Sequence, residues 1–267
     1  MQGNYQKIRS AGLGLTAISY DSPAILKSFA ERQHIAFSLV SDSQSQIIRS
    51  FGILNPQPKP GTPTYGIPNP GVYVLDPQGV VTSKYFEDDY RERDTAALIL
   101  MKQFGIAPDA PHTSFQAKHL SVTASASTPD ARMGQHITLI LDVDLPARVH
   151  VYAPGVQGYI PIDWTQTDSG AAKPEATVYP QAKRISLPVI NEVVPVYEGY
   201  FRLTRDIVIG PDKVVSPLLD PAGNLTVEGT LRYQACDDQK CFLPENVPVK
   251  WTFHFDPLDR TRATASR

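Results

Sequence analysis

Two long segments near the C-terminus alternate between apolar and polar residues. In the first segment, the apolar positions of one face are Leu225, Val227, Leu231 and Tyr233. In the second segment, they are Val247, Val249, Trp251, Phe253 and Phe255. A period of two residues is typical of a strand with one buried face, because successive side chains of a strand point to opposite faces. We therefore predict two strands of one sheet, joined by a connection that contains Cys236 and Cys241.

The chain has two cysteines in 267 residues, and both lie in this connection. A zinc site is disfavoured, because two thiolates with no histidine at ligand spacing supply half of a tetrahedral shell. A structural disulfide would restrain the unfolded chain by only about 2 kcal/mol, because the loop that it closes is short. The third alternative is a redox-active dithiol, since strain in a short turn-borne loop makes a disulfide easier to reduce.

Charged neighbours distinguish the two thiols. Asp237 and Asp238 disfavour the thiolate of Cys236, whereas Lys240 favours the thiolate of Cys241. We therefore predict that Cys241 is the more reactive sulfur and that Lys240 supports it.

The segment Tyr-Gln-Ala-Cys-Asp-Asp-Gln-Lys-Cys-Phe-Leu-Pro, residues 233–244, resembles the active-site signature of the N-terminal periplasmic domain of the thiol:disulfide interchange protein DsbD. The resemblance extends over about residues 119–256. It implies an immunoglobulin-like sandwich, with Cys236 and Cys241 as the catalytic pair and a thiol/disulfide protein as the partner. It also implies supporting roles for Tyr152, as an aromatic residue beside the pair, and for Tyr197, near the cap loop of that family.

From residue 119 onward the sequence has an all-β character. Apolar residues alternate between residues 137 and 145, with Ile140 as the one exception. Further short strands are predicted at residues 148–152, 159–164, 182–187 and 201–209. Strands of this length, separated by Gly and Pro turns, predict two packed sheets.

Residues 1–104 alternate instead between helix and strand. Strands are predicted at residues 13–19 and 36–40, both buried as in a parallel sheet, and a hairpin at residues 72–86. Helices are predicted at residues 2–10, 23–34, 43–51 and 94–104. In the second helix, Ser22 and Pro23 form the start, and Ile25, Leu26 and Phe29 belong to the inner face. This order predicts a thioredoxin-like α/β domain.

Motifs in this part resemble the AhpC/TSA redoxins, which are peroxiredoxin-like. They are Ile-Ser-Tyr-Asp-Ser at 18–22, Leu-Val-Ser-Asp at 39–42, Phe-Gly-Ile at 51–53 and Gly-Ile-Pro-Asn-Pro-Gly-Val-Tyr-Val-Leu-Asp at 66–76. The resemblance implies a cis peptide bond before Pro70, in a supporting position beside the active site of that family.

The catalytic cysteine of redoxins lies at the start of the first helix, after a first strand, and this chain opens inside that helix. We therefore expect an incomplete domain, by truncation rather than by survival as a scaffold. We also expect that this part alone does not reduce a peroxide, because the thiolate performs that reaction.

These observations predict four segments: a redoxin-like domain at residues 1–104, a linker at 105–118, a DsbD-like β-sandwich at 119–257 and a tail at 258–267. The fold class is an incomplete thioredoxin-like α/β domain plus an all-β immunoglobulin-like sandwich.

The predicted function is that of a thiol–disulfide redox protein, with oxidoreductase or antioxidant activity by resemblance and electron relay through Cys236 and Cys241. The alternative is a non-catalytic binding or scaffold protein with a structural disulfide. A formal net charge of −2 gives no electrostatic case for nucleic acid. No apolar run approaches the ~20 residues of a membrane span. No cofactor or metal is expected.

The first residues show no apolar core of a signal peptide, although the DsbD resemblance implies a periplasmic or extracytoplasmic location. Six histidines are scattered without metal-ligand spacing. Among them, His150 is the one that we expect to approach the cysteines, because it lies beside Tyr152.

Overall fold

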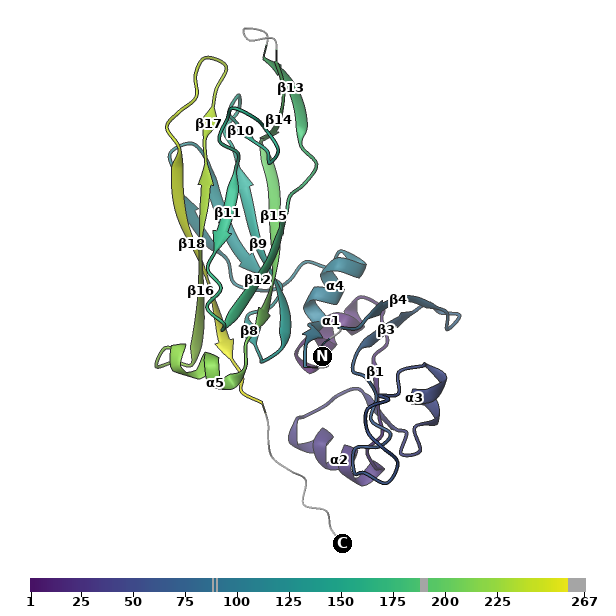
Figure 1. Cartoon of the computed structure of the whole chain (residues 1–267). Helices are drawn as coiled ribbons and strands as arrows, with labels where there is room; N and C mark the ends of the chain where they lie inside the picture. The colour runs from purple at the N-terminus through teal and green to yellow at the C-terminus, as the bar shows by residue number, and fades with distance from the viewer. Residues whose placement is uncertain (88, 90, 188–191, 259–267) are drawn as a thin grey trace. The chain divides into compact units, whose positions relative to one another are not determined.

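A computed structural model of the chain describes residues 1–87, 89, 91–187 and 192–258. The chain forms two compact units, Met1–Gly105 and Ile106–Leu258 (Figure 1). The predicted tail, apart from Leu258, lies outside the described residues. No helix among the described residues is long and apolar enough to cross a membrane.

The first unit alternates helices with strands. Its elements are η1 Gln2–Asn4, α1 Tyr5–Ser10, β1 Thr16–Ser19, α2 Pro23–Arg32, β2 Ser38–Ser41, α3 Gln46–Ser50, β3 Val72–Leu75, β4 Val81–Tyr85, β5 Arg93–Asp94 and α4 Ala96–Phe104. β1 and β2 pair in parallel, and β3 and β4 form an antiparallel hairpin. The predicted thioredoxin-like α/β class is confirmed.

Local sequence sets the ends of the longer helices. The hydroxyl of Ser22 accepts a hydrogen bond from the backbone N–H of Ile25 at 3.4 Å and so caps α2. Thr95 caps α4 in the same way, by accepting from the N–H of Leu98 at 3.0 Å. Gly105 ends α4 with a φ of 64°, in the left-handed region that favours glycine.

Two expectations about burial in this unit are wrong. Ile18 on β1 is 37% exposed, because β1 and β2 form a two-stranded sheet rather than the centre of a larger one. On α2, Ile25 and Phe29 are each 41% exposed, whereas Leu26 is buried. The apolar pattern identified both elements, but burial also depends on what packs against them.

The expectation of a cis bond before Pro70 is also wrong. The described residues contain no cis peptide bond, so the bond before Pro70 is trans. The trans form is favoured by about 0.5–1 kcal/mol in an X–Pro peptide, and a cis bond therefore needs specific support from the fold.

The second unit consists almost entirely of strands. Its elements are β6 Thr113–Gln116, β7 Ser121–Ala126, β8 Asp130–Ala131, β9 Gln135–Asp144, β10 His150–Tyr152, β11 Asp163–Gln166, β12 Ala172–Val178, β13 Lys183–Leu187, β14 Glu192–Glu198, β15 Tyr200–Ile209, α5 Asp212–Val215, η2 Ser216–Leu218, β16 Asn224–Tyr233, β17 Ala235–Cys236 and β18 Glu245–Phe255.

These strands form three sheets. Within this unit, one sheet has the order β12-β15-β9-β7-β6, and a second has the order β11-β16-β18-β8. A smaller third sheet has the order β13-β14-β10-β17 and carries Cys236. Figure 1 shows the third sheet at the end of this unit opposite α5. The predicted immunoglobulin-like β-sandwich is confirmed.

One continuous apolar core lies within the sandwich. It includes Leu141 and Leu203, which pair across β9 and β15, and Leu231 on β16, all 0% exposed. The rings of Trp164 and Trp251 stack with centroids 5.2 Å apart. The indole of Trp251 donates a hydrogen bond to the carbonyl of Ser125 at 2.7 Å, so its polar atom is satisfied inside the core.

The alternating segments at the C-terminus are strands β16 and β18, and they pair with each other along the whole of β16, from Asn224↔His254 to Tyr233↔Glu245. All nine apolar positions predicted for their inner faces are buried, as the sequence pattern requires. The predicted linker, in contrast, contains strand β6, whose residues pair with β7 from Thr113↔Ala124 to Gln116↔Ser121. This strand was missed because the hydrogen bonds of β7, rather than an apolar pattern of its own, order it.

Candidate redox site

The two cysteines close a tight hairpin between β17 and β18. Cys236 and Cys241 form a disulfide with Cα atoms 3.9 Å apart, at opposite positions of an antiparallel bridge. The N–H of Asp237 donates to the carbonyl of Lys240 at 2.9 Å, and the N–H of Phe242 donates to the carbonyl of Ala235 at 2.8 Å. Backbone hydrogen bonds on both sides therefore hold the cysteines opposite each other.

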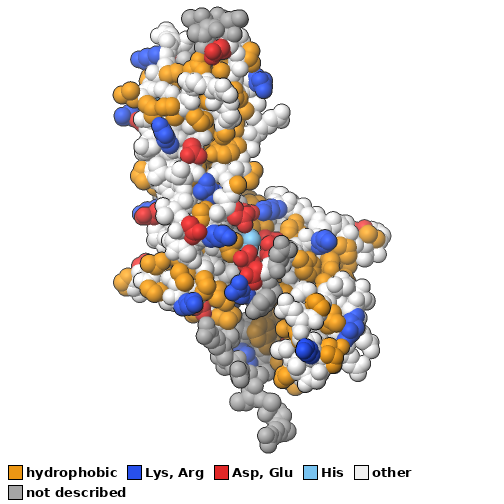
Figure 2. Space-filling model, viewed as in Figure 1, with side chains coloured by type: hydrophobic (Ala, Val, Ile, Leu, Met, Phe, Trp, Pro, Cys, Tyr) orange, Lys and Arg blue, Asp and Glu red, His pale blue; other side chains and the backbone are white. Residues whose placement is uncertain are grey.

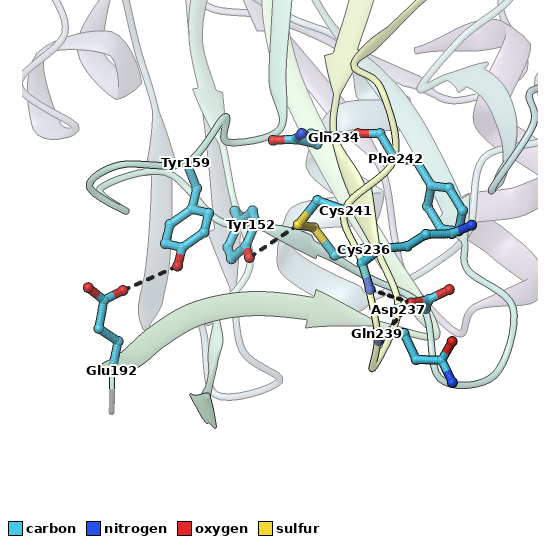
Figure 3. The surroundings of a disulfide bond; sticks show 10 residues. Tyr152, Tyr159, Glu192, Gln234, Cys236, Asp237, Gln239, Cys241 and Phe242 are labelled. Carbon is cyan, nitrogen blue, oxygen red and sulfur yellow. Dashed lines mark hydrogen bonds between the residues drawn. A yellow bond between two sulfur atoms is a disulfide. The ribbon is translucent and has the colours of Figure 1, made fainter. Parts of the chain in front are cut away.

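Asp237 stabilises the turn. Its carboxylate accepts hydrogen bonds from the backbone N–H groups of Gln239 and Lys240, each at 2.8 Å (Figure 3). These bonds hold the pKa of Asp237 below its ordinary value. Asp238 forms an ion pair with Arg148, whose Nε lies 2.7 Å from Oδ2. The acidic charges predicted to disfavour the thiolate of Cys236 are thus engaged in the turn.

The two sulfurs have different surroundings. Cys236 is 2% exposed and packs with Tyr152, Val194 and Val196. Cys241 is exposed on the surface of the hairpin. The two halves of the disulfide thus differ in solvent exposure: residue 241 is exposed, and residue 236 is buried.

Tyr152 contacts the disulfide directly. Its ring is buried, and its hydroxyl oxygen lies 3.7 Å from Sγ of Cys241 (Figure 3). Because a disulfide sulfur carries no proton, the hydroxyl is the donor. Burial, followed by the nearby Tyr159 and Glu192, raises the pKa of Tyr152, so the hydroxyl keeps its proton at neutral pH.

A second aromatic residue covers Tyr152. The ring of Tyr159 stacks on it with centroids 4.3 Å apart, and the hydroxyl of Tyr159 donates to Glu192 at 3.3 Å (Figure 3). Neither Tyr159 nor Glu192 was predicted as a site residue. The strand predicted at residues 159–164 is wrong at its start, because β11 spans Asp163–Gln166 and Tyr159 lies in the irregular segment before it. Gln234 was missed as well; its side chain donates to the carbonyl of Phe242 at 3.0 Å.

Of the six predicted site residues, Cys236, Cys241 and Tyr152 contact one another, and Lys240 lies in the turn between the two cysteines. The ammonium of Lys240 lies over the ring of Phe242, 5.3 Å from its centroid. Tyr197 faces the other side of the sheet, where its ring stacks on Phe201 at 4.7 Å and its hydroxyl donates to the carbonyl of Pro180. Pro70 belongs to the first unit.

A polar cluster anchors the strands that lead into and out of the hairpin. The hydroxyl of Tyr233 donates to Glu245 at 2.6 Å, and Nζ of Lys118 lies 3.1 Å from the same carboxylate. These contacts hold the pKa of Glu245 below its ordinary value of 4.5, with the tyrosine hydrogen bond as the largest cause. Burial, followed by the hydrogen bond to Glu245, raises the pKa of Tyr233.

This cluster predicts a pH-dependent contribution to stability. Because the pKa of Glu245 is lowered by folding, its contribution is complete above about pH 4.5 and is lost as the pH falls below that value. Glu245→Gln should lower the free energy of unfolding by about 1 kcal/mol at pH 7, and the difference from the wild type should shrink below pH 4.5. Urea unfolding at several pH values measures this. Glu228→Gln, an exposed position on the adjacent strand β16, is the control and should show no change.

Charge on the sandwich surface is mixed. On the face visible in Figure 2, acidic and basic side chains are interspersed over this unit. This distribution agrees with the small net charge of the chain.

Two family models match separate parts of the chain. The AhpC/TSA family matches residues 1–84. The family described as thiol:disulfide interchange protein DsbD, N-terminal, matches residues 117–251. Both resemblances predicted from the sequence motifs are confirmed.

Curated relatives match about a third of the chain. Peroxiredoxin Q, chloroplastic, from Populus jackii is 35% identical over 82 residues, which are 31% of this chain and 36% of the relative. Alkyl hydroperoxide reductase C from Staphylococcus saprophyticus is 24% identical over 103 residues, which are 37% of this chain and 51% of the relative. The chain thus spans between 36% and 51% of the length of these relatives.

Two solved structures are similar to the chain. The N-terminal periplasmic domain of ScsB from Proteus mirabilis has 14% identity and a TM-score of 0.34, covering 56% of this chain and 52% of that one. The reduced N-terminal domain of DsbD from Neisseria meningitidis has 11% identity and a TM-score of 0.29, covering 43% of this chain and 80% of that one.

The DsbD family model covers just over half of the chain, including the hairpin with both cysteines and strand β10 with Tyr152. The chain therefore belongs to the family of the N-terminal domain of the thiol:disulfide interchange protein DsbD.

Proposed function

We propose that the chain relays electrons from its reduced Cys236–Cys241 pair to the disulfide of a partner protein. Both family matches are to thiol redox families, and the only two cysteines of the chain form one disulfide. These findings support a thiol–disulfide redox role.

The observation that carries the relay proposal is the difference in exposure within the pair. Cys241 is exposed, whereas Cys236 is 2% exposed and lies directly opposite Cys241. Exchange needs one sulfur that a partner can reach and a second sulfur placed to attack the first. A disulfide with only a structural role has no need of an exposed sulfur.

The exchange proceeds in two displacements. The thiolate of Cys241 attacks one sulfur of the partner disulfide, a bond forms between the two proteins, and the other partner sulfur leaves as a thiolate. The thiolate of Cys236 then attacks the sulfur of Cys241, the internal disulfide forms, and the second partner thiolate leaves. The pair loses two electrons and two protons, and the partner gains both. A dithiol donor reduces the pair again by the reverse exchange.

The partner that we propose is an oxidised protein of the redoxin type. Support comes from the AhpC/TSA match to residues 1–84 of the same chain. The redoxin-like part of this sequence contains no cysteine, because both cysteines belong to the sandwich. The disulfide that accepts the electrons must therefore be formed by two other cysteines.

A direct transfer experiment tests the proposal. The chain is reduced with dithiothreitol, separated from the reductant and mixed with one equivalent of a peroxiredoxin in its disulfide form. After an acid quench, alkylation and mass spectrometry count the thiols of both proteins. We expect the chain to lose two thiols as the peroxiredoxin gains two. The contrary result is that the chain keeps both thiols with the peroxiredoxin and also when it is mixed with other proteins that carry exposed disulfides. In that case the disulfide has only a structural role and the relay proposal is wrong.

A further inference from the structure

Strand β10 places a histidine directly beside the buried cysteine. In the third sheet, His150 pairs with Cys236 on β17 and with Glu198 on β14. Directly opposite residues of antiparallel strands project to the same face, with Cβ atoms about 4.5–5.5 Å apart. Tyr152, two residues further along β10, packs with Cys236 on that face. The side chains of His150 and Cys236 are therefore neighbours.

The imidazole of His150 is buried and incompletely hydrogen-bonded. The residue is 6% exposed, and its Nε2 atom has no hydrogen-bond partner among the described residues. Its ring meets the ring of Tyr152 edge-on, with centroids 5.5 Å apart. A buried polar atom without a partner is uncommon in folded proteins and requires an explanation. A ring needed only for packing would be better supplied by phenylalanine.

The charges around His150 come from three segments. Glu198 lies opposite it on β14, and Asp237 and Asp238 lie in the hairpin turn, where Arg148 pairs with Asp238. The three carboxylates favour the protonated imidazole, but burial outweighs them and lowers the pKa of His150. At neutral pH the ring is therefore neutral, and one of its nitrogens can accept a proton.

The second displacement of the proposed exchange needs such an acceptor. Cys236 must become a thiolate before it attacks Cys241, yet it is 2% exposed, and bulk water has little access to its proton. Burial disfavours the thiolate further. A neutral imidazole beside the thiol removes the proton without placing a lone negative charge in the interior.

We propose that His150 is the proton acceptor for Cys236 in the step that resolves the mixed disulfide. This inference rests on the proposed relay. The proton moves from Sγ of Cys236 to the imidazole, the thiolate attacks Sγ of Cys241, and the bond between Cys241 and the partner sulfur breaks. The imidazolium then gives its proton to the departing thiolate or to water.

A dipyridyl disulfide separates the two displacements. The reduced full-length chain is mixed with one equivalent of this reagent, and absorbance follows the thiopyridone that is released. The first release reports attack by Cys241, and the second reports resolution by Cys236. His150→Gln should slow the second release by about a hundredfold and leave the first within about twofold. His254→Gln, an exposed position on β18, is the matched control and should change neither.

The pH dependence of the unmodified chain is a second measurement that needs no variant. The rate of the second release should rise with pH up to the pKa of His150 and then stay constant. It should therefore level off at a lower pH than the range in which thiols usually titrate. The inference would be overturned if His150→Gln left the rate of the second release unchanged. It would also be overturned if the logarithm of that rate in the unmodified chain rose with unit slope to about pH 8. Either result would leave the relay intact. Absence of the first release in the unmodified chain would instead remove both proposals.

Discussion

Replacing Cys241 with serine is expected to reduce electron transfer to a partner disulfide to the uncatalysed background. The hydroxyl of serine is not ionised at neutral pH without a dedicated base, so it does not replace the thiolate. The remaining cysteine, Cys236, is 2% exposed and is therefore too buried to contact a partner disulfide. The thiol-counting assay with an oxidised peroxiredoxin measures the loss.

Cys236→Ser should behave differently, although it removes the same disulfide. Cys241 remains exposed in this variant and attacks the partner, but no second thiol resolves the product. A stable mixed disulfide should therefore accumulate with one partner molecule per chain and appear as a single adduct by mass spectrometry. The two variants are controls for each other. The assigned roles would be contradicted if neither variant formed the adduct, or if only Cys241→Ser formed it.

Leu141→Ala should have the largest effect on folding stability. Leu141 lies on β9 in the centre of the largest sheet of the sandwich, is 0% exposed and pairs with Leu203 and Ala124. Removal of a buried leucine side chain costs about 2–5 kcal/mol, because transfer energy is lost and a cavity remains. Both tryptophans of the chain, Trp164 and Trp251, lie in the sandwich core, so urea unfolding followed by tryptophan fluorescence reports on this unit.

The matched control is the same substitution at an exposed site. Leu243 is 86% exposed, and Leu243→Ala should change the free energy of unfolding by less than about 0.5 kcal/mol. Similar effects of the two substitutions would contradict the assignment of the stabilising core to the sandwich interior.

The sequence pattern predicted strands best where one face is continuously buried. The inner faces of β16 and β18 follow directly from alternation, since a shift of one residue would expose Leu231 and Trp251 to water. The same pattern failed at β6, a short strand whose Phe115 is its one large apolar residue. The partner strand β7 orders β6, and no local signal reveals that pairing.

The candidate site was predictable in part. The spacing of Cys236 and Cys241 and the turn between them lie within one short segment, so local sequence was sufficient. Tyr152 was reached through the family resemblance, and the structure places its hydroxyl 3.7 Å from Cys241.

Contacts that link distant segments were not predictable. Tyr159 reaches the site by stacking on Tyr152 from an irregular loop, and the register between β10 and β17 decides that His150 lies opposite Cys236. Tyr197 was assigned to the site through the family resemblance, but strand alternation turns its side chain to the opposite face from Val196, which packs with Cys236.

The reduction potential of the Cys236–Cys241 pair tests the central claim most directly. The oxidised chain is equilibrated with glutathione and dithiothreitol buffers of graded ratio, and alkylation with mass spectrometry gives the reduced fraction at each ratio. A pair that exchanges electrons with proteins should have a potential above about −300 mV and reach equilibrium in the folded state. A potential below that value, with reduction only after unfolding, would show that the disulfide is structural and would contradict the account.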